Sequence, residues 1–176
     1  MTDSRTALVT GASGYVGGQL VPRLLENGWT VKVLTRRRSS VADRAWADDV
    51  EVVEGDVASE ADMRAALAGV DATWYLVHSM DDRPDFQQRD RDAATTFAAA
   101  AAHEGVSRIV YLGGLHPDGE KLSPHLASRV EVGQILLDAP VPAAVLQAAV
   151  VVGDGSASFD MLRYLTTRLP AMIAPK

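Results

Sequence analysis

The sequence predicts an α/β domain with one doubly wound parallel sheet covered by helices on both faces. Six short runs rich in β-branched residues alternate with stretches of helical periodicity along the chain. The runs are almost continuously apolar, as is typical of parallel strands buried on both faces. With right-handed crossovers, this alternation favours about six strands in the order 3-2-1-4-5-6.

In the first half of the chain, Asn27-Gly28 marks the end of the first helix, because a residue in the left-handed conformation favours glycine there. The β-branched runs on either side of this helix then define the first two strands. The strands expected in this half are residues 6–10, 30–35 and 50–55, and the helices lie near 15–27, 41–47 and 60–68.

The second half contains an alanine-rich segment, 93–102, that resembles low complexity. Its apolar residues nevertheless recur at helical spacing from Phe86 onwards, which predicts a long packed helix that ends at Gly105. Ser123-Pro124 is typical of a helix N-cap followed by proline at the first helical position. The strands expected here are 72–77, 108–113 and 143–148, and the helices lie near 85–104, 124–138 and 157–169.

The composition excludes several classes of function. A chain of 176 residues with 47% hydrophobic and 23% charged residues is typical of one globular domain. Its net charge of −6 argues against a nucleic-acid partner, since phosphate backbones attract a surplus of Lys and Arg. The absence of cysteine excludes disulfides, thiolate metal sites and a cysteine nucleophile, and the four histidines fit no metal-binding pattern.

No segment of the sequence predicts a membrane location. The N-terminus is polar, unlike a signal peptide, and the longest apolar run, 139–152, is shorter than the about 18 residues of a membrane span. We therefore expect a cytoplasmic protein.

The motif that carries most information is G-x-x-G-x-x-G between the first strand and the first helix. Gly11 permits the tight turn, Gly14 lets the backbone approach a pyrophosphate, and Gly17 lets the helix pack close to the strand. Amides at the helix start then bind phosphate, and Ser13 either caps the helix or donates to a phosphate oxygen. A glycine turn that only packs is the alternative. The expected cofactor contacts of this turn are Gly11, Ser13, Gly14, Tyr15, Val16 and Gly17.

The residues after the second strand favour NADP over NAD. An NAD site usually places a carboxylate about 20 residues after the glycine motif. This sequence has Arg36, Arg37 and Arg38 there, and its next carboxylate is Asp43. Guanidinium groups bind the 2′-phosphate of NADP in a fork, although a solvated basic loop is the alternative.

Together these blocks resemble the short-chain dehydrogenase/reductase superfamily, in its extended or atypical branch. More narrowly, they look like NmrA-like proteins that carry a C-terminal DUF2867 domain. Because such proteins are longer, residues 1–176 are expected to form a single NAD(P)-binding Rossmann domain truncated before a substrate domain. The blocks are TGASGYVG (10–17), EGDV (54–57), YLVHSM (75–80), RIVYLGGL (108–115), LSPHLASRVEVGQILL (122–137) and GSASFDMLRYLTTRLP (155–170).

The resemblance implies further cofactor contacts. Asp56 and Val57 would border the adenine, although Asp56 is also typical of a cap or turn residue. Leu76 and Val77, after the fourth strand, would line the side of the adenosine ribose. His78 and His116 follow the fourth and fifth strands, at the carboxyl edge where doubly wound sheets bind ligands. Either these histidines line the ligand pocket, or they are ordinary loop residues.

The superfamily's chemistry uses a serine after the fifth strand and a Tyr-x-x-x-Lys pair on the next helix. This sequence has Gly113-Gly114 and then His125 and Arg129, which keep the spacing that places both side chains on one helix face. His125 titrates near neutrality and is the candidate acid/base, while Arg129 would hold a ribose or phosphate. A surface histidine beside a cofactor-binding arginine is the alternative.

Three functions remain open. The chain is the NADP(H)-binding domain of an oxidoreductase that lacks the usual catalytic residues, a dinucleotide sensor without turnover, or an inactive scaffold. The expected partners are a nicotinamide dinucleotide (NADP first, NAD second), an unidentified small substrate and a second copy in a homodimer, with no nucleic acid or membrane.

Overall fold

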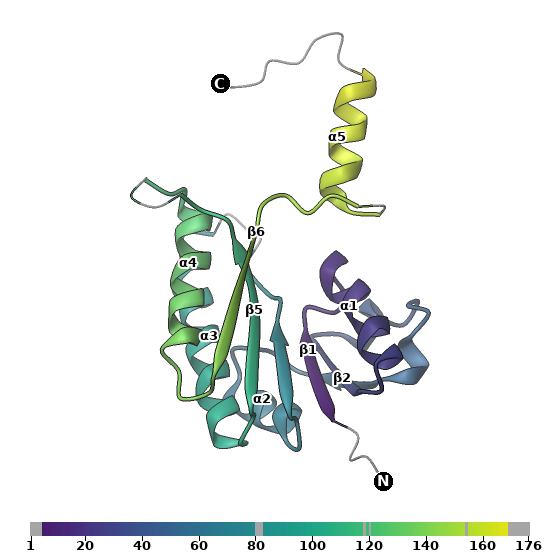
Figure 1. Cartoon of the computed structure of the whole chain (residues 1–176), viewed down its shortest axis with the longest axis vertical. Helices are drawn as coiled ribbons and strands as arrows, with labels where there is room; N and C mark the ends of the chain where they lie inside the picture. Colours follow the sequence, from purple (N-terminus) through teal and green to yellow (C-terminus); the bar gives the residue numbers. More distant parts are fainter. Residues whose placement is uncertain (1–4, 80–82, 118, 120, 154, 169–176) are drawn as a thin grey trace.

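The six predicted strands form one parallel sheet in the predicted order, β3-β2-β1-β4-β5-β6 (Figure 1). The computed structural model describes residues 5–79, 83–117, 119, 121–153 and 155–168. The strands are β1 (Thr6–Thr10), β2 (Thr30–Thr35), β3 (Glu51–Glu54), β4 (Ala72–Tyr75), β5 (Arg108–Gly114) and β6 (Ala143–Ala148). The predicted doubly wound α/β class is thereby confirmed.

Helices cover the two faces of this sheet unequally. The larger core joins Met63 of α2, Phe97 of α3 and Leu136 of α4 to the strands on one face. The smaller core joins Val21 and Leu24 of α1 to β1 and β2 on the other face (Figure 1). The helices are α1 (Tyr15–Glu26), α2 (Glu60–Leu67), α3 (Phe86–His103), α4 (Pro124–Leu137) and α5 (Ala157–Arg168).

The predicted helix boundaries are mostly confirmed. Gly28 and Gly105 have φ of 77° and 73°, as expected of the residues that end α1 and α3. The Ser123 hydroxyl accepts the amide of Leu126 at 3.3 Å and caps α4. Phe86 and Phe97 are buried, so the alanine-rich segment is indeed a packed helix.

The helix predicted near residues 41–47 is wrong. Turns occupy this stretch between two short 3₁₀ helices, η1 (Arg38–Ser40) and η2 (Ala47–Asp49). Long-range contacts replace helical ones here: the Trp46 Nε1–H donates to the Gly18 carbonyl at 3.1 Å. That carbonyl lies four residues before Pro22, which has no N–H to donate to it. The tryptophan therefore satisfies an acceptor that the proline leaves open within α1.

The sheet is not covered on both faces throughout. Each residue of β6 is half-buried or exposed, and α5 has no buried residue. In Figure 1 α5 projects away from the sheet beyond the carboxyl end of β6. The expectation of strands buried on both faces is therefore wrong for β6.

None of the helices within the described ranges is long and apolar enough to cross a bilayer.

Candidate functional site

The glycine turn lies directly against the end of β4. Gly11 has φ of +76°, and a Cβ there would lie 2.7 Å from the Leu76 carbonyl oxygen. A Cβ on Gly17 would lie 2.4 Å from the Gly11 carbonyl oxygen. Both positions therefore require glycine, one for its conformation and both for the close approach. The turn brings two predicted groups of cofactor contacts, those around Gly11 and those around Leu76, side by side.

Gly14 is the open point of the turn. It is the N-cap of α1, with extended backbone and no side-chain cap. A Cβ there would meet only the Gly11 carbonyl oxygen, at 3.3 Å. Ser13 is exposed next to it and does not cap the helix, which is one of the two roles that the sequence left open for it. The amides that follow, at Tyr15, Val16 and Gly17, have no acceptor within the helix and fit a phosphate.

Two of the four arginines near this turn are used by the fold itself. Arg44 Nη2 donates to the Ser13 carbonyl at 2.6 Å and supports the glycine turn. Arg38 Nη2 donates to the Val52 carbonyl at 2.8 Å and ties the loop to β3. Arg36 and Arg37 are exposed, and their guanidinium groups form no hydrogen bond or ion pair within the described ranges. These two cations are therefore available to a ligand.

The loop that carries Arg36 and Arg37 is held in shape by hydroxyl groups. Thr35 Oγ1 and Ser40 Oγ are 2.7 Å apart, and Ser40 Oγ also donates to the Arg37 carbonyl at 2.8 Å. Glu54, at the end of the neighbouring strand, accepts the Arg38 amide at 3.3 Å. Glu54 is a carboxylate beside the end of β2 that the sequence did not predict. The strand register pairs it with Thr35, although the two residues are far apart in the chain.

Asp56 serves the fold as a turn residue. Its carboxylate accepts the Ala58 amide at 2.9 Å, while its own amide donates to Asp62 at 2.9 Å. Val57 packs against the larger core. Both residues follow β3 at the carboxyl edge of the sheet, and their contact with adenine stays a prediction.

His78, which follows β4, lies near Arg129, Asp90 and His125. Burial of the imidazole by the atoms around it lowers the pKa of His78, although the residue as a whole is exposed. The charges of Arg129 and His125 lower this pKa further, whereas the Asp90 carboxylate raises it. The structure thus brings the two predicted catalytic residues near the predicted cofactor residue His78.

His125 and Arg129 are held by different contacts. The His125 ring stacks on Phe86, with centroids 4.3 Å apart and planes at 22°. The Arg129 side chain lies over the end of β5, where a Cβ on Gly114 would be 4.0 Å from Nη1. The expected serine position is therefore occupied by glycine backbone with an arginine above it.

No tyrosine in this part of the sheet replaces the missing catalytic one. Burial raises the pKa of Tyr111 to about 12, and its hydroxyl donates to the Arg129 carbonyl at 3.2 Å. Burial, together with the Asp90 charge, raises the pKa of Tyr75 as well. Both phenols stay protonated near neutrality.

Asp90 is a site residue that the sequence analysis does not predict, because it lies in a stretch rich in charged residues, and charged residues are usually exposed to solvent. Asp90 Oδ1 accepts the Ser79 amide at 3.0 Å, and Oδ2 accepts the hydroxyl of buried Ser128 at 3.0 Å. One carboxylate on α3 thus joins the loop after β4 to α4. Its position one helical turn after buried Phe86 was the available signal.

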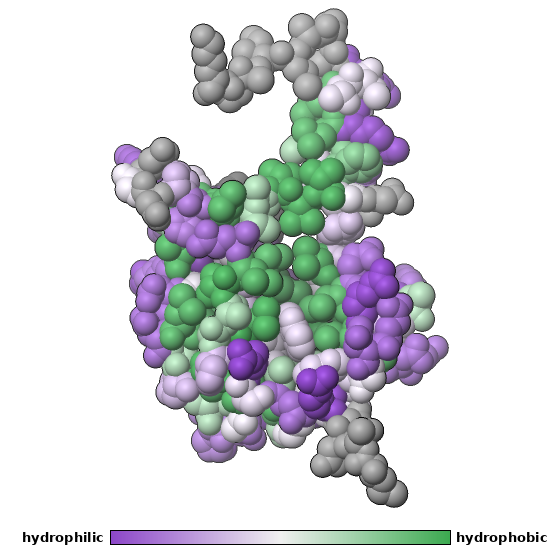
Figure 2. Space-filling model, viewed as in Figure 1, coloured by the Kyte–Doolittle hydropathy of each residue, from purple (hydrophilic) through white to green (hydrophobic). Residues whose placement is uncertain are grey.

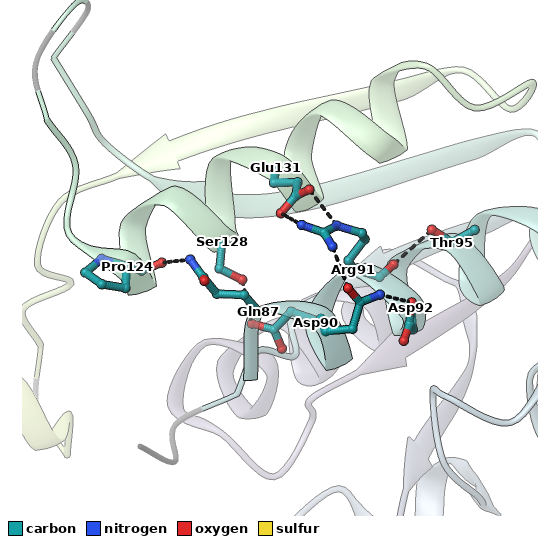
Figure 3. Close-up of polar contacts among 9 residues, drawn as sticks. Gln87, Asp90, Arg91, Asp92, Thr95, Pro124, Ser128 and Glu131 are labelled. Carbon is teal, nitrogen blue, oxygen red and sulfur yellow. Dashed lines mark hydrogen bonds and ion pairs between the residues drawn. The ribbon is translucent and has the colours of Figure 1, made fainter. Parts of the chain in front are cut away.

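Other polar contacts reinforce the pairing of α3 with α4 (Figure 3). Arg91 donates to Glu131 through Nε at 2.6 Å and Nη2 at 3.1 Å. Gln87 Nε2 donates to the Pro124 carbonyl at 3.2 Å. Because this ion pair is half-exposed, it orients the helices more than it stabilises them.

His116 lies beside a cavity of about 150 Å³ between α4, β5 and β6. Arg129, Gln147 and the glycines that end β5 share its lining. His103, by contrast, ends α3 and contacts Glu104 and Arg64. The described side chains contain no cluster of three or more histidines and carboxylates that could hold a metal ion.

Comparison with known proteins shows the family. A protein family described as NAD(P)H-binding matches residues 11–152, which is most of the chain and includes the glycine turn, the basic loop and α4. The chain belongs to this NAD(P)H-binding family. The NAD(P)-binding role predicted from the glycine turn is thereby confirmed for the domain as a whole.

Curated relatives of this NAD(P)H-binding domain include reductases. Ceramide reductase of Caulobacter vibrioides is 28% identical over 176 residues, covering 97% of this chain and 54% of that protein. An NmrA-like family domain-containing oxidoreductase of Aspergillus versicolor is 39% identical over 82 residues, covering 46% of this chain and 23% of that protein. The match thus spans about half the length of the bacterial relative. It spans 23% of the length of the fungal relative. The chain is therefore similar to an NmrA-like oxidoreductase over part of its length.

A solved structure shows the same fold. Triphenylmethane reductase of Citrobacter sp., in complex with NADP(H), matches with a TM-score of 0.73 at 21% identity, covering 92% of this chain and 55% of that chain.

Proposed function

We propose that this NAD(P)H-binding domain prefers NADP(H) and takes its 2′-phosphate between Arg36 and Arg37. The observation that carries this proposal is that both guanidinium groups are uncommitted, whereas Arg38 and Arg44 are bound to backbone carbonyls. If the loop were basic for structural reasons alone, its arginine side chains would bond to other parts of the fold. Two charged donors on a loop held by Thr35 and Ser40 suit a dianionic phosphate.

The remaining cofactor contacts follow the carboxyl edge of the sheet. The glycine turn would hold the pyrophosphate with the amides at the start of α1. We assign the adenine side to Asp56 and Val57, and the ribose side to Leu76, Val77 and His78. These assignments are supported by the way Gly11 packs against the Leu76 carbonyl.

We further propose that the whole protein is an oxidoreductase acting on a small molecule. A bound nicotinamide would supply the hydride. His125 would give a proton to the substrate oxygen, and Arg129 would hold the ribose or a phosphate. The proximity of both residues to His78 supports this assignment. The names of the curated relatives, among them a ceramide reductase, support the reaction class but identify no substrate.

A dinucleotide sensor without turnover is the second candidate. It is favoured by the glycine backbone at the serine position and by the two buried, protonated tyrosines. Replacement of His125 by Gln separates the candidates. If the protein is an enzyme, this variant should no longer oxidise NADPH in the presence of its substrate. If the protein is a sensor, neither the unmodified protein nor the variant should oxidise NADPH.

Three properties of the whole protein are proposed from the sequence. They are a cytoplasmic location, a longer chain that continues into a C-terminal DUF2867 domain, and assembly as a homodimer. The half-length match to ceramide reductase supports the longer chain.

Calorimetric titration with NADPH and NADH tests the cofactor assignment. Replacing Arg36 and Arg37 together by Ala should weaken NADPH binding by about 10- to 100-fold, since hydrogen bonds to charged groups contribute about 1.5–3 kcal/mol. NADH binding should be unchanged, because NADH lacks the 2′-phosphate.

Arg23→Ala is the matched control. Arg23 is an exposed arginine in the last turn of α1, paired with Glu26 at 2.8 Å and distant from the carboxyl edge of the sheet. This variant should bind both cofactors as the unmodified chain does. Equal affinity of the unmodified chain for NADH and NADPH would overturn the assignment.

A further inference from the structure

The segment between η1 and η2 docks on the glycine turn and on the start of α1. We call residues 41–46 the docked segment; they form turns, and two of their side chains bond to backbone carbonyls. Arg44 Nη2 donates to the Ser13 carbonyl at 2.6 Å, and Trp46 Nε1 donates to the Gly18 carbonyl at 3.1 Å. Trp46 is also buried in the smaller core beside α1. The docked segment is therefore fixed to the region where the glycine turn enters the helix.

Gly18 leaves the room that the Arg44 guanidinium occupies. A Cβ on Gly18 would lie 3.2 Å from Arg44 Nη1 and 3.4 Å from Cζ, and 3.5 Å from the Ala12 carbonyl oxygen. Gly18 is a residue of α1 without the positive φ that favours glycine, and glycine is less favourable than alanine inside a helix. The backbone conformation therefore does not explain glycine here. What the absent side chain provides is room for the guanidinium.

Arg44 places a positive charge beside the N-terminal end of α1. The first turn of this helix has no acidic residue, and in the described part of the chain Arg44 forms no ion pair. The positive end of a helix dipole favours anions, so a cation beside it is unfavourable until an anion joins them. The surface over α1 is largely hydrophilic, as suits a charged ligand (Figure 2). The pyrophosphate expected at the glycine turn is such an anion.

The bond from Arg44 fixes the peptide that joins Ser13 to Gly14. The carbonyl of this peptide accepts from Arg44, and its amide donates to the Gly11 carbonyl at 3.0 Å. Because the peptide unit is planar, it cannot rotate without breaking one of these two bonds. The next amide, that of Tyr15, is one of those expected to meet the pyrophosphate. The orientation of the fixed peptide therefore sets the position of the first phosphate-binding amide.

We infer that Arg44 is a positioning residue for the dinucleotide, which acts on the pyrophosphate through the Ser13 carbonyl and not by contact with the 2′-phosphate. The inference rests on the proposed binding of the pyrophosphate at the glycine turn. The docked segment continues the loop that carries Arg36 and Arg37, so the same bond also joins that loop to the turn. Arg44 thereby holds both phosphate sites of NADP(H) in one arrangement before the ligand binds. Preorganisation of this kind raises affinity, because less ordering remains to be done on binding.

Substitution of Arg44 tests this role directly. In calorimetric titration, Arg44→Ala should bind NADPH and NADH each about 10-fold more weakly, because both ligands carry the pyrophosphate. Arg44→Lys retains a charged donor and should restore most of the affinity. Arg23→Ala, the control on the same helix, should bind both cofactors as the unmodified chain does. A loss confined to NADPH would show contact with the 2′-phosphate instead, and unchanged affinity for both cofactors would show no positioning role; either result would overturn the inference.

Gly18 offers a second variant, which disturbs the same bond without changing the arginine. Gly18→Leu places a side chain where the guanidinium lies, so it should weaken the binding of both cofactors about as much as Arg44→Ala does. In the double variant the leucine occupies the space that the arginine leaves. Its affinity should therefore equal that of Arg44→Ala alone. Additive losses would show that the two residues act separately, against the inference.

Two further measurements separate this role from a purely structural one and from the proposed function. Urea unfolding should place the midpoint of Arg44→Ala close to that of the unmodified chain, since Arg44 is exposed. A purely structural role would lower that midpoint and leave the affinity of the folded protein unchanged. The ratio of NADPH to NADH affinity in the unmodified chain tests the assignment of Arg36 and Arg37. Equal affinities would overturn that assignment and leave the role of Arg44 in NADH binding intact.

Discussion

Asp90 links three parts of the candidate site through a single carboxylate. One oxygen holds the loop after β4 through the Ser79 amide, and the other holds α4 through Ser128. Its charge also raises the pKa of His78, which the charge of Arg129 lowers. A carboxylate in this position sets both the geometry and the charge of the edge where the nicotinamide is expected.

We predict that Asp90→Asn lowers the pKa of His78 further. The Asp90 charge stabilises the imidazolium form, so its removal favours the neutral ring. NMR titration of the imidazole should place the midpoint of the unmodified protein below the ordinary value of about 6.5, and that of the variant lower still.

Asp92→Asn is the matched control for this titration. Asp92 is an exposed carboxylate on the same helix that accepts Gln88 Nε2 at 2.7 Å. Its replacement removes the same charge and should leave the His78 midpoint unchanged. Equal shifts in the two variants would show that Asp90 acts only through the net charge of the domain.

Single residues were predictable from the sequence where local geometry decides their role. Gly11 follows from the turn that the motif requires, and Ser123 follows from its place before Pro124. Asp90 was missed because charge suggested solvent, although its helical spacing placed it on the buried side. Arg38 and Arg44 bond to backbone carbonyls of residues far away in the chain. The sequence therefore could not show that only Arg36 and Arg37 are available to a ligand.

Among the elements, the connection between β2 and β3 departs most from the sequence prediction. The stretch predicted as a helix near 41–47 forms turns up to the start of η2, because Arg44 and Trp46 bond to the glycine turn and to α1. Those partners precede them by about 30 residues, and the open Gly18 carbonyl exists only because Pro22 cannot donate. Local periodicity contains none of this information.

Two glycines inside helices should respond oppositely to alanine. A Cβ on Gly133 in α4 would lie 3.5 Å from Tyr111 and Val145, at ordinary contact distance, so Gly133→Ala should stabilise the fold by about 0.5–1 kcal/mol. A Cβ on Gly17 in α1 would lie 2.4 Å from a backbone oxygen, so Gly17→Ala should destabilise it by about 1–3 kcal/mol. Urea unfolding measures both changes as shifts of the midpoint at constant m. Stabilisation by Gly17→Ala would contradict the close approach of α1 to the glycine turn.

For the whole molecule, the strand order of the sheet was predictable from the sequence. Which parts of the two sheet faces are covered by helices was not. Continuous apolar strands and right-handed crossovers restrict the topology strongly. The same rules predict helices over both faces, yet in the described ranges β6 and α5 contain no buried residue. A stretch of sequence that is apolar enough to be buried does not specify which element covers it.

Binding of NADPH should raise the thermal stability of the whole domain, because the turn, the basic loop and the edge of the sheet are all proposed to contact this one ligand. At 100 times its dissociation constant a ligand adds about 2.7 kcal/mol. At about 2–4 °C per kcal/mol for a chain of this size, the melting temperature should rise by about 5–11 °C in calorimetry. NADH at the same concentration should give a smaller rise, because it has no 2′-phosphate for Arg36 and Arg37.

Gly14→Val should remove the response to both cofactors while keeping the fold, since a side chain there enters only the open point of the turn. A full NADPH response in Gly14→Val would show that the dinucleotide binds away from the glycine turn.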